Sequence, residues 1–177
     1  MAGHEIAVAL QRAEAVFLRR PEAALHEDAP GVVCWAGGTR MVSTHPNGSQ
    51  VVTDMPAEYG GSGDQVSPGW LLRSSVAACA ATSIALVAAR EGIALDRLEV
   101  HVTSRSDARG LLGMDDGQGA PVYPGPQDLA MQVLIRAAGV APGRLHELVE
   151  EGGRRAPNSS AIRDALAMPL RIKVEAG

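Results

Sequence analysis

Aromatic residues and cysteines are both scarce in this sequence of 177 residues. Phe, Trp and Tyr together make up 3% of the chain, so a core must be built from Ala, Val, Leu, Ile and Met. The two cysteines are too few for the disulfide framework that holds small secreted proteins together. With 46% hydrophobic and 20% charged residues, the chain has the composition of a globular protein, and its length suits one domain over residues 1–177.

An excess of positive charge is also missing. The net charge is −4, which argues against a general nucleic-acid or anionic-membrane surface. The N-terminus lacks the basic and apolar pattern of a secretory signal. The longest apolar stretch, from Val76 to Ala89, is interrupted by Cys79, Thr82 and Ser83 and is too short to span a bilayer. We therefore expect a cytoplasmic protein with no nucleic-acid partner and no membrane partner.

The N-terminal third of the chain predicts a helix followed by a hairpin. Apolar residues recur at helical spacing over 4–19, which predicts an amphipathic helix. Two strands are expected over 31–44 and 49–55, because the Asn47-Gly48 pair between them favours a tight turn.

The middle of the chain predicts one long helix. Ser67 suits the N-cap and Pro68 the first helical position, and the helical pattern continues to about Glu91 before Gly92 ends it. Nearly every residue in between is small or apolar. We therefore expect this helix to be buried on most sides at the centre of the fold.

The remaining segments predict strands and short helices. Leu98, Val100 and Val102 alternate with polar residues, which is typical of a half-buried strand. The other expected elements are a loop over 108–126, a strand over 129–135, a helix over 142–151, a turn over 159–166 and a closing strand over 170–174. This order indicates an α+β fold rather than a doubly wound sheet, with no second domain.

Several short motifs in this order resemble the signature of the OsmC/Ohr family. They are Pro56-x-Glu58-x-Gly60-Gly61, Ser67-Pro68, Ala77-Ala78-Cys79, Gly92-Ile93 and Asp107-x-Arg109-Gly110. The resemblance covers residues 31–175 as an OsmC-like core and leaves 1–28 as an N-terminal helical extension. It implies an α+β fold in which a β-sheet packs on a long buried central helix. It also implies an intertwined homodimer, with active sites at the subunit interface that reduce organic hydroperoxides through a thiol.

Cys79 is the candidate nucleophile. A peroxide is reduced by a thiolate, and a cysteine surrounded only by alanines would be an unreactive core residue. The resemblance implies that Arg40 is the cation beside the sulfur and that Glu58 orients its guanidinium group. The alternative interpretations are a core cysteine, a solvated strand arginine and an exposed loop carboxylate.

The chain departs from the family pattern at the second cysteine. Relatives use it to form a disulfide with the oxidised first cysteine, whereas the matching places here hold Ala156 and Ser160, which cannot do so. Cys34 lies on a different predicted element and is interpreted as a core residue or a substitute resolving cysteine. The predicted enzyme therefore depends on an external thiol or dithiol reductant. The alternative is a non-catalytic homodimer that binds a small apolar ligand at its interface pocket.

Neither a cofactor nor a metal is expected. The five histidines show no HxxxH or HExxH spacing, and such spacing is what brings two imidazoles to one metal on a helix. The expected partners are a second copy of the chain, an organic hydroperoxide and the external reductant.

Overall fold

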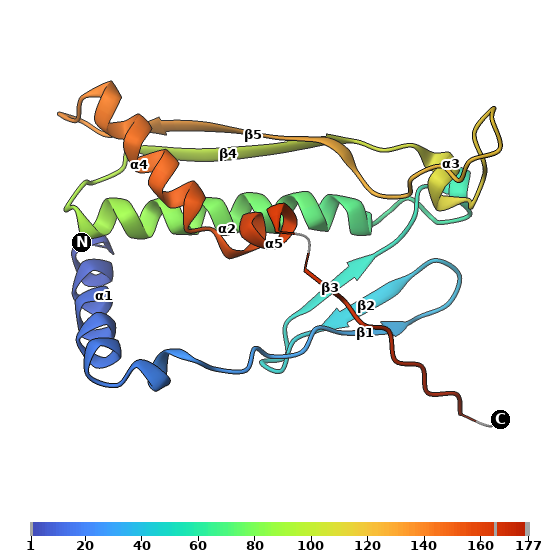
Figure 1. The fold of residues 1–177 in the computed structure, drawn as a ribbon, viewed down its shortest axis with the longest axis horizontal. Coiled ribbons are helices and arrows are strands. Elements are labelled where there is room, and N and C mark those ends of the chain that lie inside the picture. The colour runs from blue at the N-terminus through green and yellow to red at the C-terminus, as the bar shows by residue number, and fades with distance from the viewer. Residues whose placement is uncertain (1, 165, 176–177) are drawn as a thin grey trace.

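The computed structural model describes residues 2–164 and 166–175, arranged around one long helix (Figure 1). In chain order the helices are α1 (Ala2–Arg19), the 3-10 turns η1 (Pro21–Ala24) and η2 (Ala57–Tyr59), α2 (Pro68–Arg90), α3 (Ala108–Leu111), α4 (Pro142–Arg154) and α5 (Pro157–Arg163). The strands are β1 (Val32–Trp35), β2 (Met41–Thr44), β3 (Gln50–Thr53), β4 (Arg97–Arg105) and β5 (Gln127–Arg136). The β4–β5 pair covers one face of α2, while α4 and α5 run along its side and α1 meets its C-terminal end.

The central helix α2 begins and ends where the sequence predicts. The Ser67 hydroxyl accepts a hydrogen bond from the backbone N–H of Trp70 at 3.2 Å, and Pro68 occupies the first turn. After Glu91, Gly92 adopts a left-handed conformation with φ 69° and ends the helix. By length and composition alone a helix of this kind could also cross a membrane. Here its buried face packs against β4, α4 and α5, as the core helix of a folded protein does.

The expectation that α2 is buried on most sides is only partly met. A stripe along one face of the helix is exposed in the single chain, formed by Leu72, Ser75, Ala78, Thr82 and Leu86. These residues are three or four positions apart and therefore lie on one side of the helix. The predicted burial is achieved mainly in the C-terminal half of the helix, where five of its seven buried residues lie.

The hydrophobic core lies at the C-terminal half of α2. Ile84, Val87 and Ala88 form a buried cluster with Leu148 of α4, and apolar residues of β4 and β5 pack against it. At Gly152 a Cβ atom would lie 2.6 Å from the Ile84 Cα, so glycine allows α4 to approach α2 closely.

The N-terminal sheet contains three strands instead of the two predicted. The predicted hairpin at Asn47-Gly48 is confirmed: β2 and β3 pair antiparallel, with Gly48 at φ 90°. The predicted strand over 31–44 is wrong as one element, because a turn at Gly37-Gly38 divides it into β1 and β2. Both glycines have positive φ, which lets the chain reverse there.

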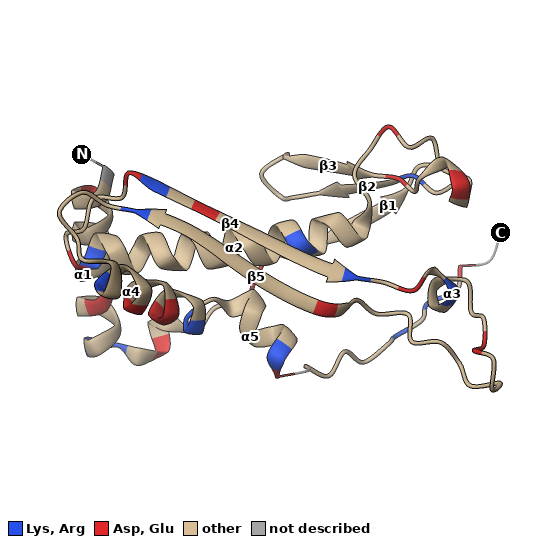
Figure 2. Ribbon diagram, turned by 90° about the horizontal axis from the view of Figure 1, so that it is seen from above, with Lys and Arg blue, Asp and Glu red and all other residues tan. Residues whose placement is uncertain are grey.

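The second sheet and its connections follow the prediction with local differences. The strands β4 and β5 pair antiparallel, and burial alternates along β4 as its sequence pattern indicates. The predicted loop over 108–126 contains the short helix α3, and the predicted turn over 159–166 is the helix α5. Charged residues lie at both ends of the β4–β5 pair and leave its middle largely uncharged (Figure 2).

The predicted closing strand is not formed within the described residues. Leu170, Ile172 and Val174 alternate as in a strand, but the segment 166–175 has no regular structure and these side chains are exposed. A strand needs a neighbouring backbone to accept and donate its hydrogen bonds. Figure 1 shows the segment leaving α5 and running away from the β4–β5 pair, and none of residues 166–175 is paired with a strand of either sheet.

Candidate active site

Cys79 lies on α2 within the exposed stripe and is half-buried. Its Sγ accepts a hydrogen bond from the backbone N–H of Asn158 at 3.4 Å. The Asn158 side chain donates to the Ser75 carbonyl at 3.3 Å, one turn earlier on α2. The first turn of α5 is therefore held against α2 beside the sulfur.

The segment that the family resemblance matches to a second cysteine, residues 155–160, lies against Cys79. Ala156 is fully buried at the start of α5 and Ser160 is half-buried in the same helix. No thiol is available at either residue. The only other cysteine, Cys34, lies on β1 in the N-terminal sheet, and its side chain is exposed instead of lying in the core as interpreted above.

Arg40 lies between the Gly37-Gly38 turn and β2, where it is bound by acidic residues. Its terminal Nη2 donates to Asp54 Oδ2 at 3.0 Å, to the Ser62 hydroxyl and to Asp64. Two carboxylates therefore accept from one guanidinium group. We call Arg40, Asp54, Ser62 and Asp64 the arginine cluster.

Asp54 is the centre of this cluster, and its side chain is only 4% exposed. Thr39 donates to one carboxylate oxygen at 2.5 Å, and the Ser62 hydroxyl donates to the other at 2.6 Å. These hydrogen bonds, first from Ser62 and then from Thr39, hold the pKa of Asp54 far below its ordinary value, with a smaller contribution from Arg40. The stability that Asp54 contributes is therefore present at neutral pH and is lost only in strong acid.

The glycines of the Pro56-x-Glu58-x-Gly60-Gly61 motif close this loop over Asp54. A Cβ atom at Gly61 would lie 1.8 Å from the Met55 carbonyl oxygen, a distance that no side chain tolerates. Gly60 adopts a left-handed conformation with φ 81° at the end of η2. The two glycines therefore allow Ser62 to reach Asp54. Sequence reasoning missed Asp54, Ser62 and Asp64, although the acidic residues flanking a glycine-rich loop were the available signal.

The three predicted site residues are not brought together within the single chain. Glu58 lies in η2 and is exposed. Among the described residues, neither Glu58 nor Cys79 is a hydrogen-bond partner of Arg40, whose carboxylate partners are Asp54 and Asp64. The joint role of Cys79, Arg40 and Glu58 stays a prediction.

The Asp107-x-Arg109-Gly110 motif has a structural role in this chain. Asp107 caps α3 by accepting from the Arg109 backbone N–H at 3.0 Å, and both of its carboxylate oxygens accept from the Arg109 guanidinium. A Cβ atom at Gly110 would lie 2.5 Å from the Tyr123 carbonyl oxygen. The motif thus allows the end of the 108–126 loop, at Tyr123, to lie close to α3.

An apolar cavity of about 460 Å³ lies between this segment, η2 and the beginning of α2. Its walls include Met55, Pro56, Tyr59, Leu72 and Leu111. Leu72 belongs to the same face of α2 as Cys79, seven residues earlier. Among residues 2–164 and 166–175, no group of three or more His, Cys, Asp or Glu side chains is placed to hold a metal ion.

Comparison with known proteins identifies the family. A model of the family described as OsmC-like protein matches residues 61–171, which is more than half of the chain. No functionally curated protein matches the sequence.

Solved structures share the fold at low sequence identity. An OsmC-like protein from Mycoplasma pneumoniae is 16% identical with a TM-score of 0.64, over 78% of this chain and 89% of that one. An organic hydroperoxide resistance protein from Elizabethkingia anophelis is 18% identical with a TM-score of 0.56, over 78% and 90% of the two chains. The organic hydroperoxide resistance protein OsmC of Legionella pneumophila is 21% identical with a TM-score of 0.55, over 78% and 92%. The fold is therefore α+β and OsmC-like, and the chain belongs to the OsmC-like protein family.

Proposed function

We propose that this chain reduces organic hydroperoxides, with Cys79 as the peroxidatic thiolate and an external thiol as the reductant. The observation that carries the proposal is the position of the Cys79 Sγ. It is half-buried on an apolar helix, beside a backbone N–H of the segment that bears the second cysteine in relatives. A backbone N–H in this position can donate a hydrogen bond to the sulfur during the reaction. In the single chain the sulfur is half-open on the side of α2 that carries the exposed stripe.

The proposed chemistry transfers one oxygen atom to sulfur. The Cys79 thiolate attacks the terminal oxygen of the hydroperoxide, the O–O bond breaks, and the alkoxide takes up a proton and leaves as an alcohol. The sulfur loses two electrons and becomes a sulfenic acid. One external thiol condenses with it and releases water. A second thiol reduces this mixed disulfide and restores Cys79, so that each hydroperoxide consumes two thiols.

Arg40 would serve this reaction as a directional donor. The two carboxylates of the arginine cluster outweigh the single positive charge of Arg40, but they engage only its Nη2 among the described residues. The N–H groups on Nε and Nη1 remain to be directed at a peroxide oxygen or at the sulfur. Glu58 remains the residue proposed to orient the guanidinium group.

A homodimer would complete the site. The exposed stripe of α2 carries Leu72 and Leu86 at 39% and 37% exposure, and Cys79 lies within it. Apolar side chains on one helix face are usually covered in the native assembly. We propose that a second copy covers this stripe and brings its own arginine cluster near Cys79. This fits the intertwined dimer that the family resemblance implies.

The proposal also includes the domain organisation and the cellular location that the sequence predicts. Residues 31–175 form the proposed OsmC-like core and 1–28 the extension, whose helix α1 is tied to α2 by an ion pair between Glu14 and Arg90. The cytoplasm remains the predicted location.

The decisive experiment follows hydroperoxide consumption with cumene hydroperoxide and dithiothreitol. Cys79→Ser should abolish turnover, while the matched Cys34→Ser variant should keep it. Intact mass after one equivalent of peroxide should show a gain of one oxygen on Cys79. A loss of two hydrogens would show instead that Cys34 acts as the resolving cysteine.

The role of Arg40 is tested by alkylation of Cys79 with iodoacetamide and by kcat/KM for the hydroperoxide. Arg40→Met should lower kcat/KM by about a hundredfold or more, the size of one lost transition-state donor. Arg40→Lys should retain part of the activity, and Glu58→Gln should produce a smaller loss. If Arg40→Met changed neither rate, Arg40 would have no part in the site.

The second candidate function is a non-catalytic homodimer that binds a small apolar molecule. It is favoured by the apolar cavity beside Leu72 and by the absence of a thiol at residues 156 and 160. If Cys79 gained no oxygen even in excess cumene hydroperoxide, this function would replace the first. Saturable binding of an apolar probe to that cavity should then be weakened by Leu72→Asp.

A further inference from the structure

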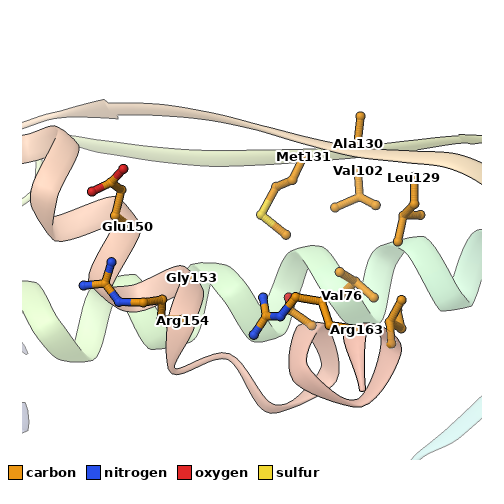
Figure 3. Close-up of a pocket in the computed structure, with 11 residues that line it drawn as sticks. Val76, Val102, Leu129, Ala130, Met131, Glu150, Gly153, Arg154 and Arg163 are labelled. Atoms are coloured by element: carbon orange, nitrogen blue, oxygen red, sulfur yellow. The ribbon is translucent and has the colours of Figure 1, made fainter. Parts of the chain in front are cut away.

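A second cavity, of about 440 Å³, lies between the β4–β5 pair and the helices α2, α4 and α5. Val102, Leu129 and Met131 point from the sheet toward α2, where Val76 forms the opposite wall (Figure 3). Ile162 of α5 completes the apolar lining. Cys79 is not among the residues that line this cavity. The volume lies within the range of pockets that hold small organic molecules.

Two arginines without a carboxylate partner border this apolar cavity. Arg154 and Arg163 lie along the edge formed by α4 and α5 (Figure 3). Arg163 donates to the Ser160 hydroxyl at 2.9 Å, and within the described part of the chain neither arginine forms an ion pair. By contrast, the neighbouring Arg144 and Arg155 are both paired with glutamates.

A favourable position at the end of a helix explains only part of this arrangement. Arg154 and Arg163 lie in the last turns of α4 and α5, where the helix dipole favours cations. That effect does not require both side chains to border the same apolar cavity. Glu150 is the one acidic residue of the lining, so two positive charges and one negative charge surround the opening.

A buried hydroxyl group without a partner marks the same wall. Ser159 lines the cavity from α5, and its Oγ is the one buried side-chain polar atom in the described residues that has no hydrogen-bond partner. Buried polar groups are nearly always satisfied, so this wall of the cavity is not fully packed in the single chain, and a small rotation of the Ser159 side chain would turn its hydroxyl toward a bound polar group.

We propose that this cavity binds an amphiphilic carboxylate, with its apolar tail against Met131 and Val102 and its carboxylate between Arg154 and Arg163. The two unpaired guanidinium groups supply charge-assisted donors, which bind carboxylates more strongly than neutral donors do. The chain's own segment 166–175 is the competing occupant. It carries Arg171 and Lys173 against the single Glu175, so its charge does not complement the two arginines.

Isothermal titration calorimetry on the full chain tests this site with decanoate, kept below its micelle concentration, and with 1-decanol of equal chain length. Decanoate should bind at least about tenfold more tightly than decanol, because only the carboxylate pairs with the arginines. The double variant Arg154→Gln/Arg163→Gln should remove this preference. The matched variant Arg12→Gln changes an exposed arginine on α1 and should leave it intact. Circular dichroism should show that the variants keep the wild-type fold.

Three outcomes would overturn the proposal. They are equal affinity for decanoate and decanol, no binding of either compound, and an undiminished preference in the double arginine variant. Hydrogen exchange on the ligand-free chain adds a fourth: strong protection of amides 166–175 would indicate that this segment fills the cavity. The site is independent of peroxide chemistry, so decanoate binding should persist in Cys79→Ser.

Discussion

The two halves of α2 are both rich in small and apolar residues but have different surroundings. Five of its seven buried residues lie from Ser83 onward, where Leu148 of α4 and the apolar faces of β4 and β5 close over the helix. Before Ser83 only Val76 and Ala80 are buried, and Leu72 is exposed. An apolar helix is therefore buried only where another element of the chain reaches it.

The packed half of α2 supplies the core of the protein, whereas the open half carries the candidate reactive residue. The closed half has a complete core and no candidate reactive group. The open half carries Cys79 and borders the apolar cavity beside Leu72, whereas the arginine cluster lies in the segment that precedes the helix. Binding sites are usually assembled at such incompletely packed edges, and here the edge is where we propose that a second copy packs.

The largest expected effect comes from truncating a buried residue in the closed half. Ile84 is fully buried, and Ile84→Ala should lower the free energy of unfolding by about 2–5 kcal/mol. Urea denaturation measures this at two protein concentrations. In dilute protein, Leu72→Ala in the open half should lower the free energy of unfolding by less than Ile84→Ala does. Its main effect should be a higher dimer dissociation constant. If both variants lowered the free energy of unfolding equally at every protein concentration, the two halves of α2 would not differ in this way.

The close approach of α4 to α2 gives the next largest effect. Gly152→Ala should destabilise the chain by about 1–3 kcal/mol, because the new Cβ would meet Ile84. The matched variant Gly153→Ala has open space around its Cβ and lies in the same helix. It should be neutral or stabilising by up to about 1 kcal/mol, since alanine is the better helix former. Thermal unfolding of the two variants tests the close contact between residue 152 and Ile84. Similar decreases in melting temperature in both variants would argue against it.

A smaller effect is expected at the first turn of α2 in the open half. Ser67→Ala should lower the free energy of unfolding by about 1 kcal/mol, because the Trp70 N–H loses its side-chain acceptor and keeps only the Ser67 carbonyl. Ser67→Asp should retain stability, since aspartate caps equally well. Chemical denaturation distinguishes them. A loss in the aspartate variant as large as in the alanine variant would show that the hydroxyl has another role.

The smallest effect is expected from an exposed charge cluster on β4. Arg97 and then His101 lower the pKa of Glu99, so this carboxylate contributes stability at neutral pH that is lost as the pH falls through its lowered pKa. Glu99→Gln should therefore lower the melting temperature slightly at about pH 7, and this difference should shrink as the pH falls through the lowered pKa of Glu99. Melting curves across this range test the sign. A larger loss at the acidic end would contradict it.

Elements whose signals lie close together in the sequence were predicted well. The N-cap at Ser67, the C-terminal Gly92 and the Asn47-Gly48 hairpin each depend on a few adjacent residues. The Gly37-Gly38 turn was missed because the strand pattern on both sides is continuous. The closing strand was predicted from alternation alone, but a strand forms only beside a partner backbone.

For the candidate site, the sequence determined which residue is the nucleophile candidate and which segment stands opposite it. The ordered motifs identified Cys79, and the fold does bring residues 156–160 against it. The partners of Arg40 came from the tertiary structure alone. Asp54 follows β3 and Asp64 follows the Gly60-Gly61 turn, and only the folded loop brings both to one guanidinium group. Local patterns fix helix ends and turns because the interacting groups are neighbours in the chain, whereas charges distant in sequence meet only after the backbone has closed.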